Sequence, residues 1–214
     1  MHIQESTKPV TSWREFRREY AMIVLSILTA LGFDRAATYL HDRAAAQDSR
    51  ARIEQEIAAN ITDLRGAMDA DLKSVQSQRA ALHDLMADLT SPKPDPAKQK
   101  QILTGELQQH LGLSLPAWER DAWDAALADQ SAAHMDPRDL RRYAQLYTSA
   151  RDAADATHIL LNGSLFDRLA DLSVDLQLNR ADGREGAQLL ARFLATAEQI
   201  TAIQRELLAA AERK

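Results

Sequence analysis

One stretch of the chain is poorly suited to water. Tyr20–Phe33 runs fourteen residues without a charged side chain, and Tyr20–Leu40 spans 21 residues interrupted only by Asp34 and Arg35. A helix that crosses the hydrocarbon of a bilayer needs about 20 mostly apolar residues. Arginine and aspartate near the end of such a helix can reach the wet headgroup layer. The stretch therefore predicts a transmembrane anchor helix over residues 20–40, in contact with the lipid bilayer.

Two further features favour a bilayer over a protein core. The aliphatic side chains surround the helix instead of forming one stripe, and aromatic residues lie near both ends, as they do at membrane interfaces. The aliphatic residues are Met22, Ile23, Val24, Leu25, Ile27, Leu28 and Leu31, and the aromatic ones are Trp13, Phe16, Tyr20 and Tyr39. The alternatives are a helix lying in the membrane plane or covered by a partner, an ordinary core helix, and a cleaved signal peptide. The last is disfavoured because an Ala-x-Ala-like cleavage site occurs only beyond Asp34.

The orientation of a single span follows from its flanking lysines and arginines. Four precede the stretch (Lys8, Arg14, Arg17 and Arg18) and four follow it (Arg35, Arg43, Arg50 and Arg52). The upstream group lies in a short basic leader, residues 1–19, and is the more tightly clustered. We therefore expect a bacterial inner-membrane protein with its N-terminus in the cytoplasm and most of the chain in the periplasm.

The remaining sequence predicts an all-α fold. Glycine (7 residues), proline (6) and aromatic residues (5%) are scarce, whereas good helix formers dominate. A long helix over 41–90 continues the anchor and carries a coiled-coil-like seam at near-heptad spacing. The seam consists of Ile57, Ile61, Leu64, Met68, Leu72, Val75, Leu82, Met86 and Leu89. We expect this helix to be partly free-standing between membrane and bundle.

Local signals divide the rest of the chain. A proline-rich turn at 91–96 ends the long helix, and residues 97–214 form four or five shorter helices that the long helix completes into an irregular bundle. Expected helix starts are Ser114 with Pro116, Asp136 with Pro137 and Asp139, and Ser164 after Asn162-Gly163; Gly112 and Arg180–Gly183 mark further breaks. The fold prediction is thus one domain with a membrane anchor.

Composition limits the possible chemistry. The net charge of −5 provides no basic surface for nucleic acid, and the chain has no cysteine for a disulfide, a thiolate metal site or a nucleophile. Glycine-rich phosphate loops and the Gly-x-Ser-x-Gly elbow of serine hydrolases do not occur. We predict no cofactor, and the sequence gives no catalytic constellation.

Several polar and aromatic residues are weak site candidates. Glu106 and His110 stand four apart, a spacing that can ligate a metal, and Asp155 and His158 stand three apart. Solvated helix contacts are the simpler interpretation of both pairs, and also of His83-Asp84 and His134. A ligand pocket could be lined by Trp118, Trp123, Tyr143 and Tyr147. Large core residues in an aromatic-poor bundle are the simpler interpretation of these four.

Two parts of the chain resemble a group of uncharacterised bacterial proteins. The first is "REYAMIVLSILTALGFDRAATYLHDR" followed by "ARIEQEIAANITDLR", which contains Glu54, Glu56, Ile57 and Asn60; the second is Trp123–Tyr147. Those proteins have a basic leader, one membrane segment and a long helix. The resemblance covers about a third of the chain, and its motifs are loose hydrophobic patterns. It implies a membrane-anchored helical protein and brings no activity or catalytic residues.

Three functions are compatible with this sequence. The first is a non-enzymatic, membrane-anchored bundle that contacts a protein partner or associates with itself. The second is a sensory bundle that binds a small molecule near Trp118–Tyr147. The third, which the sequence supports least, is a metal-dependent helical enzyme using Glu106 and His110.

Overall fold

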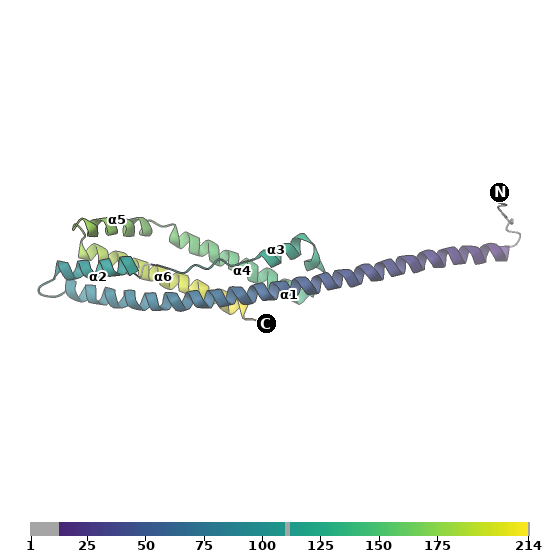
Figure 1. Cartoon of the computed structure of the whole chain (residues 1–214), viewed down its shortest axis with the longest axis horizontal. Helices are drawn as coiled ribbons and strands as arrows, with labels where there is room; N and C mark the ends of the chain where they lie inside the picture. The colour runs from purple at the N-terminus through teal and green to yellow at the C-terminus, as the bar shows by residue number, and fades with distance from the viewer. Residues whose placement is uncertain (1–12, 110–111, 214) are drawn as a thin grey trace, which may run out of the picture.

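The computed structural model describes residues 13–109 and 112–213, and every regular element in them is a helix (Figure 1). In chain order these are α1 (Trp13–Leu89), α2 (Pro96–Gln109), α3 (Asp121–Ala128), the 3-10 helix η1 (Ser131–His134), α4 (Pro137–Leu161), α5 (Leu165–Gln177) and α6 (Gly183–Ala211). The all-α prediction, with a long first helix and shorter helices packed on it, is confirmed.

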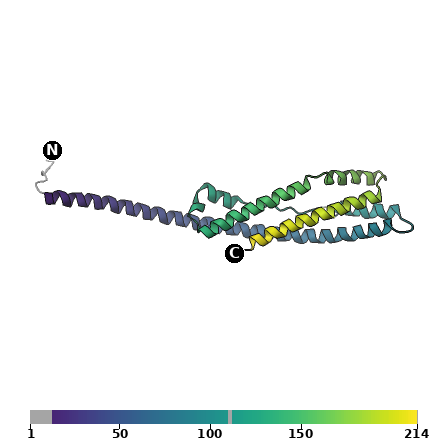
Figure 2. The same cartoon turned by 180° about the vertical axis from the view of Figure 1, so that it is seen from behind.

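The shorter helices fold against the second half of α1 (Figures 1 and 2). The chain turns after α1, returns along it through α2 and α3, runs outward again in α4 and α5, and returns in α6, which packs on α1 more extensively than any other element. Two apolar clusters fill the interior. One joins α1 to α3, η1, α4 and the end of α6 around Tyr143, and the other joins α1 to α2, α5 and the start of α6 around Phe193.

The first third of α1 lies clear of the other helices in both views (Figures 1 and 2). Leu25, Ile27 and Leu28 are 64%, 54% and 61% exposed, and Ala46 is the first buried residue in the described part of α1. This helix is long and apolar enough to cross a membrane, and its apolar window has none of its residues buried.

The bundle begins directly after the apolar stretch. The imidazole of His134, at the end of η1, lies 3.8 Å from the carboxylate of Asp42. The expectation of a free-standing length of helix between the predicted span and the bundle is therefore wrong. The reason is that η1 and the start of α4 reach back along α1, where His134 contacts Asp42 and Asp139 pairs with Arg50 at 2.9 Å.

The buried stripe of α1 coincides with the predicted seam only in part, at Ile57, Leu64 and Val75. Leu72 and Met86 remain 46% and 48% exposed, whereas several polar residues are buried. The buried positions are Ala46, Ser49, Ile53, Ile57, Asn60, Leu64, Ala67, Asp71, Val75, Gln78, Leu85 and Asp88. Ser49, Asn60 and Asp71 are spaced by eleven residues, which is three turns of a nearly straight helix, so they share one face. A seam built from apolar residues alone misses them.

Aspartates begin three of the helices. Asp136 accepts a hydrogen bond from the backbone N–H of Arg138 at 2.8 Å, with Pro137 at the first helical position, as predicted. Asp95 and Asp182 do the same for α2 and α6. The expected start near Ser114 and Pro116 is wrong, because that segment is extended and α3 begins at Asp121. Ser164 occupies the position before α5 but makes no side-chain cap.

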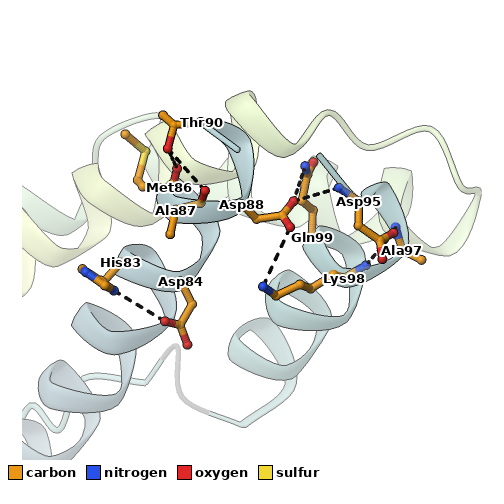
Figure 3. A network of polar contacts seen from close by, with 10 residues as sticks. All are labelled: His83, Asp84, Met86, Ala87, Asp88, Thr90, Asp95, Ala97, Lys98 and Gln99. Carbon is orange, nitrogen blue, oxygen red and sulfur yellow. Dashed lines mark hydrogen bonds and ion pairs between the residues drawn. The ribbon is translucent and has the colours of Figure 1, made fainter. Parts of the chain in front are cut away.

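A buried carboxylate ties the turn between α1 and α2 together (Figure 3). Asp88 accepts hydrogen bonds from the Gln99 side chain at 2.8 Å and from the Asp95 backbone N–H at 3.0 Å, and the Lys98 ammonium lies 3.8 Å away. The Gln99 bond, then the Asp95 bond, and finally the Lys98 charge lower the pKa of Asp88. These contacts fix the angle at which the chain reverses after Leu89.

Two glycines make a matched stability test. A methyl group at Gly186 would overlap the buried Leu103 side chain, whereas a methyl group at Gly66 meets no atom within 4 Å. We expect Gly66→Ala to raise the free energy of unfolding by about 0.5–1 kcal/mol, because alanine is the better helix former. Gly186→Ala should lower it by about 1–3 kcal/mol through overpacking. Thermal unfolding followed by circular dichroism measures both, and equal effects of one sign would contradict this packing.

Candidate functional site

The segment that joins α2 to α3 receives its hydrogen bonds from side chains of other helices. The Asp71 carboxylate accepts from the Ser114 backbone N–H at 2.8 Å, and the Gln204 amide donates to the Ser114 carbonyl at 3.1 Å. Asn60 binds Glu119 twice, donating to its carbonyl at 2.8 Å and accepting from its N–H at 2.9 Å. These side chains replace the bonds that a helix would provide.

The stretch of α1 and the extended segment that it binds have matching lengths. Eleven residues of helix, from Asn60 to Asp71, rise about 16.5 Å, and five residues of extended chain, from Ser114 to Glu119, span nearly the same distance. Pro116 also disfavours helix at Leu115. The segment therefore stays extended where a regular four-helix bundle would place a helix.

Two glutamates of α1 hold the next part of the chain. Glu54 accepts a hydrogen bond from the Tyr143 hydroxyl at 2.6 Å and also contacts Arg142. Glu56 accepts from the Tyr147 hydroxyl and from the backbone N–H of Ala122 at 2.7 Å, in the first turn of α3. The Glu-x-Glu stretch and the Trp123–Tyr147 patch, noticed separately in the sequence, thus bind each other.

The buried phenols keep their protons to high pH. Burial raises the pKa of Tyr143 to about 12, and the adjacent Glu54 carboxylate contributes to the shift. Burial and Glu56 raise the pKa of Tyr147 in the same direction. Both hydroxyls are therefore hydrogen-bond donors at neutral pH, so they act here as structural ties between α1 and α4.

The four aromatic candidates fall into two groups. Trp123 stacks on Tyr147 with ring centroids 5.5 Å apart and meets Tyr143 edge-on at 6.3 Å. These three side chains are buried in the core beside Glu54 and Glu56. Trp118, in the extended segment, packs against the edge of the same apolar cluster and also lines a cavity.

This cavity has a volume of about 440 Å³ and lies between α1, the extended segment, the second half of α4 and α6. Its walls are mainly leucine, isoleucine, alanine and proline, with Asn60, Thr157, His158, Asn162 and Gln204 as the polar exceptions. The volume is within the range of small-molecule sites. The extended segment forms one wall of the cavity, with Leu115, Pro116, Ala117 and Trp118. Sequence reasoning missed Asn60 and Gln204 as lining residues.

The metal-ligand candidates do not converge in the described part of the chain. His110 lies outside the described residues, and Glu106 is buried, with the Ser77 hydroxyl 3.4 Å from its carboxylate. His158 contacts Asn162 and Asp155 is exposed, while His83 pairs with Asp84 at 3.5 Å on the surface. Within residues 13–109 and 112–213 no three histidine or acidic side chains are close enough to share a metal ion.

The Tyr143 phenol makes the free energy of unfolding of the bundle depend on pH in the alkaline range. The unfolded chain releases this proton near pH 10 and the folded chain near pH 12, so the unfolded state binds fewer protons between these values and stability falls as pH rises. Tyr143→Phe should cost about 1–2 kcal/mol at pH 9, through loss of the bond to Glu54. We expect the difference in unfolding free energy between wild type and Tyr143→Phe to be smaller at pH 11.5, as measured by urea unfolding. A gap that stays constant would contradict the assignment.

No protein-family model matches this chain, and comparisons with curated proteins and with solved structures give no significant match.

Proposed function

We propose that the chain is a single-pass protein of a bacterial inner membrane, with residues 20–40 in the bilayer and the bundle in the periplasm. We further propose that the bundle acts by contacting other proteins, including a second copy of itself. The proposal extends the resemblance to membrane-anchored helical proteins described above for Arg18–Arg43, Ala51–Arg65 and Trp123–Tyr147.

The observation that supports it most is the exposure of the apolar part of α1. Met22, Ile23, Leu25, Ile27, Leu28 and Leu31 are all between 54% and 64% exposed, on all sides of the helix. Moving one such side chain out of water is worth about 1.5–3 kcal/mol. The bundle folds on the other part of α1 and covers none of them. A bilayer of about 30 Å hydrocarbon thickness matches a helix of this length.

The exposed face of α1 in the bundle supports a protein contact. Leu72 and Met86 are about half exposed and fourteen residues apart, which is two heptads, so they lie on one line of the helix. The same line passes Arg79, which pairs with Glu198 of α6 at 2.5 Å. A second helix lying along this line would cover both apolar side chains.

Arginine substitution tests the membrane assignment. We expect the double variant Leu28→Arg/Leu31→Arg to leave the membrane fraction, because each arginine near the centre of a span costs about 2.5–3.5 kcal/mol of insertion free energy. Leu72→Arg is the matched control, since it places arginine on an exposed leucine of the same helix beyond the predicted span. Carbonate extraction and sedimentation measure the outcome. Wild-type protein that stays soluble and monomeric without detergent would overturn the anchor.

The cysteine-free sequence allows the orientation to be read with single cysteines. Gln55→Cys lies on an exposed position of α1 after the predicted span, and Thr7→Cys lies before the span. A membrane-impermeant maleimide should label Gln55→Cys in intact spheroplasts and Thr7→Cys only after lysis. The opposite pattern would place the bundle in the cytoplasm.

Site-specific cross-linking tests the protein contact. A photoreactive amino acid at Met86 should give a discrete cross-linked product in native membranes, either a dimer or a complex with one other protein. The control position is Asp84, which is exposed on the same turn of α1 but faces nearly the opposite way. Electrophoresis and mass spectrometry identify the product. Recovery of monomer alone from Met86, or equal products from both positions, would count against the proposal.

A further inference from the structure

We propose that the cavity between α1, α4, α6 and the extended segment binds a neutral, largely apolar small molecule that carries one hydroxyl or carbonyl group. This inference is independent of the membrane anchor, because it concerns only the bundle. It assigns a ligand site to residues that the aromatic pattern of the sequence did not bring together.

Size and lining define the class of ligand. The cavity volume is about 440 Å³, and the sixteen described residues that line it include no aspartate, glutamate, lysine or arginine. Of the lining side chains only His158 can carry a charge, and it is exposed; a charged ligand group placed deeper between the walls would have no counter-charge and would lose hydration, at a cost of several kcal/mol. A neutral molecule with an aromatic or aliphatic body fits the leucine, isoleucine and alanine walls.

Two unsatisfied polar atoms define the polar part of the ligand. Gln204 is 7% exposed and lines the cavity; its amide nitrogen binds Ser114, but its Oε1 has no hydrogen-bond partner among the described residues. The indole Nε1 of Trp118, which also lines the cavity, is buried and likewise without a partner there. Buried polar atoms in native proteins are nearly always paired. Both atoms are closed to solvent, so a molecule in the cavity reaches them when the Gln204 amide or the Trp118 indole turns toward it.

The cavity is open to solvent, so a ligand can enter and leave. Its α4 side is lined by small side chains, those of Ala150, Ala153 and Ala154. On the opposite side Leu115 is 44% exposed, which shows that the cavity opens to the surface. The bonds of Asp71 and Asn60 to the two ends of the extended segment hold the opposite wall in place. This wall of the cavity is therefore held by side chains of α1.

Benzophenone is a suitable probe because it is neutral, apolar, carries a single carbonyl acceptor for Trp118 and forms covalent bonds on irradiation. The full chain is reconstituted in lipid nanodiscs, irradiated with increasing benzophenone, and digested for mass spectrometry. We expect saturable labelling within residues 115–118 and 150–162. Labelling of residues 20–40 from dissolved probe should rise linearly with concentration. Unlabelled diphenylmethanol, which offers a hydroxyl to Gln204, should suppress only the saturable labelling.

Matched variants separate the cavity from the surface. Ala154→Trp should fill the cavity and reduce the saturable labelling by about tenfold, whereas Ala144→Trp, on the same helix and outside the cavity, should leave it within about twofold. Trp118→Phe should weaken benzophenone by roughly fivefold through loss of one hydrogen bond, but should not weaken diphenylmethane, which has no polar group.

The inference fails if labelling in the wild-type protein never saturates, if diphenylmethanol does not compete, or if Ala154→Trp keeps full labelling while its circular dichroism melt matches the wild type. The competition arm uses the unmodified chain, so the test stands even where a variant does not fold.

Discussion

The fold depends on side chains that satisfy the backbone of an extended segment inside a helical bundle. A non-helical chain cannot pair its own N–H and C=O groups locally. A group of this kind that is buried without a partner costs about 1–3 kcal/mol, so the part-buried groups at Ser114 and Glu119 need side-chain partners. Asp71, Asn60 and Gln204 supply those partners at Ser114 and Glu119. This arrangement positions α3 and leaves the space that becomes the cavity.

A second constraint acts on the same helix. α1 is one continuous helix with two different parts. The first part has exposed apolar side chains on every side, and the second part has a buried face that carries both apolar and polar groups. Because the bundle begins at Asp42, directly after the apolar stretch, no flexible connection separates the two. The bundle is thus mechanically continuous with the exposed helix, and any partner or ligand bound to it lies at a fixed position along that helix.

The sequence predicted those parts of the fold that depend on local chemistry. The long helix, predicted from the lack of helix-breaking residues, is confirmed. The start of α4, predicted from Asp136 and Pro137, is confirmed as well. Predictions failed where distant side chains decide the outcome. Ser114 with Pro116 looks like a helix start, but Asp71 and Asn60, more than forty residues away, stabilise an extended chain instead. The predicted apolar seam includes the exposed Leu72 for a similar reason, since polar residues that bind this segment occupy part of the buried face.

The candidate site is also hard to predict from the sequence, because distant residues determine it. Trp118 and Trp123 are five residues apart in sequence, and a common pocket is a natural expectation for them. Trp123 lies in α3 and stacks on the tyrosines that Glu54 and Glu56 hold, whereas Trp118, in the extended segment before Asp121, packs against the edge of that cluster and lines the cavity. The signal that could have revealed this is polar: Ser49, Asn60 and Asp71 recur every eleven residues on a helix face that otherwise reads as core. Buried polar side chains need partners, and these three find them in the chain that packs on this face: Asn60 and Asp71 bind its backbone, and Ser49 binds the Ser131 hydroxyl.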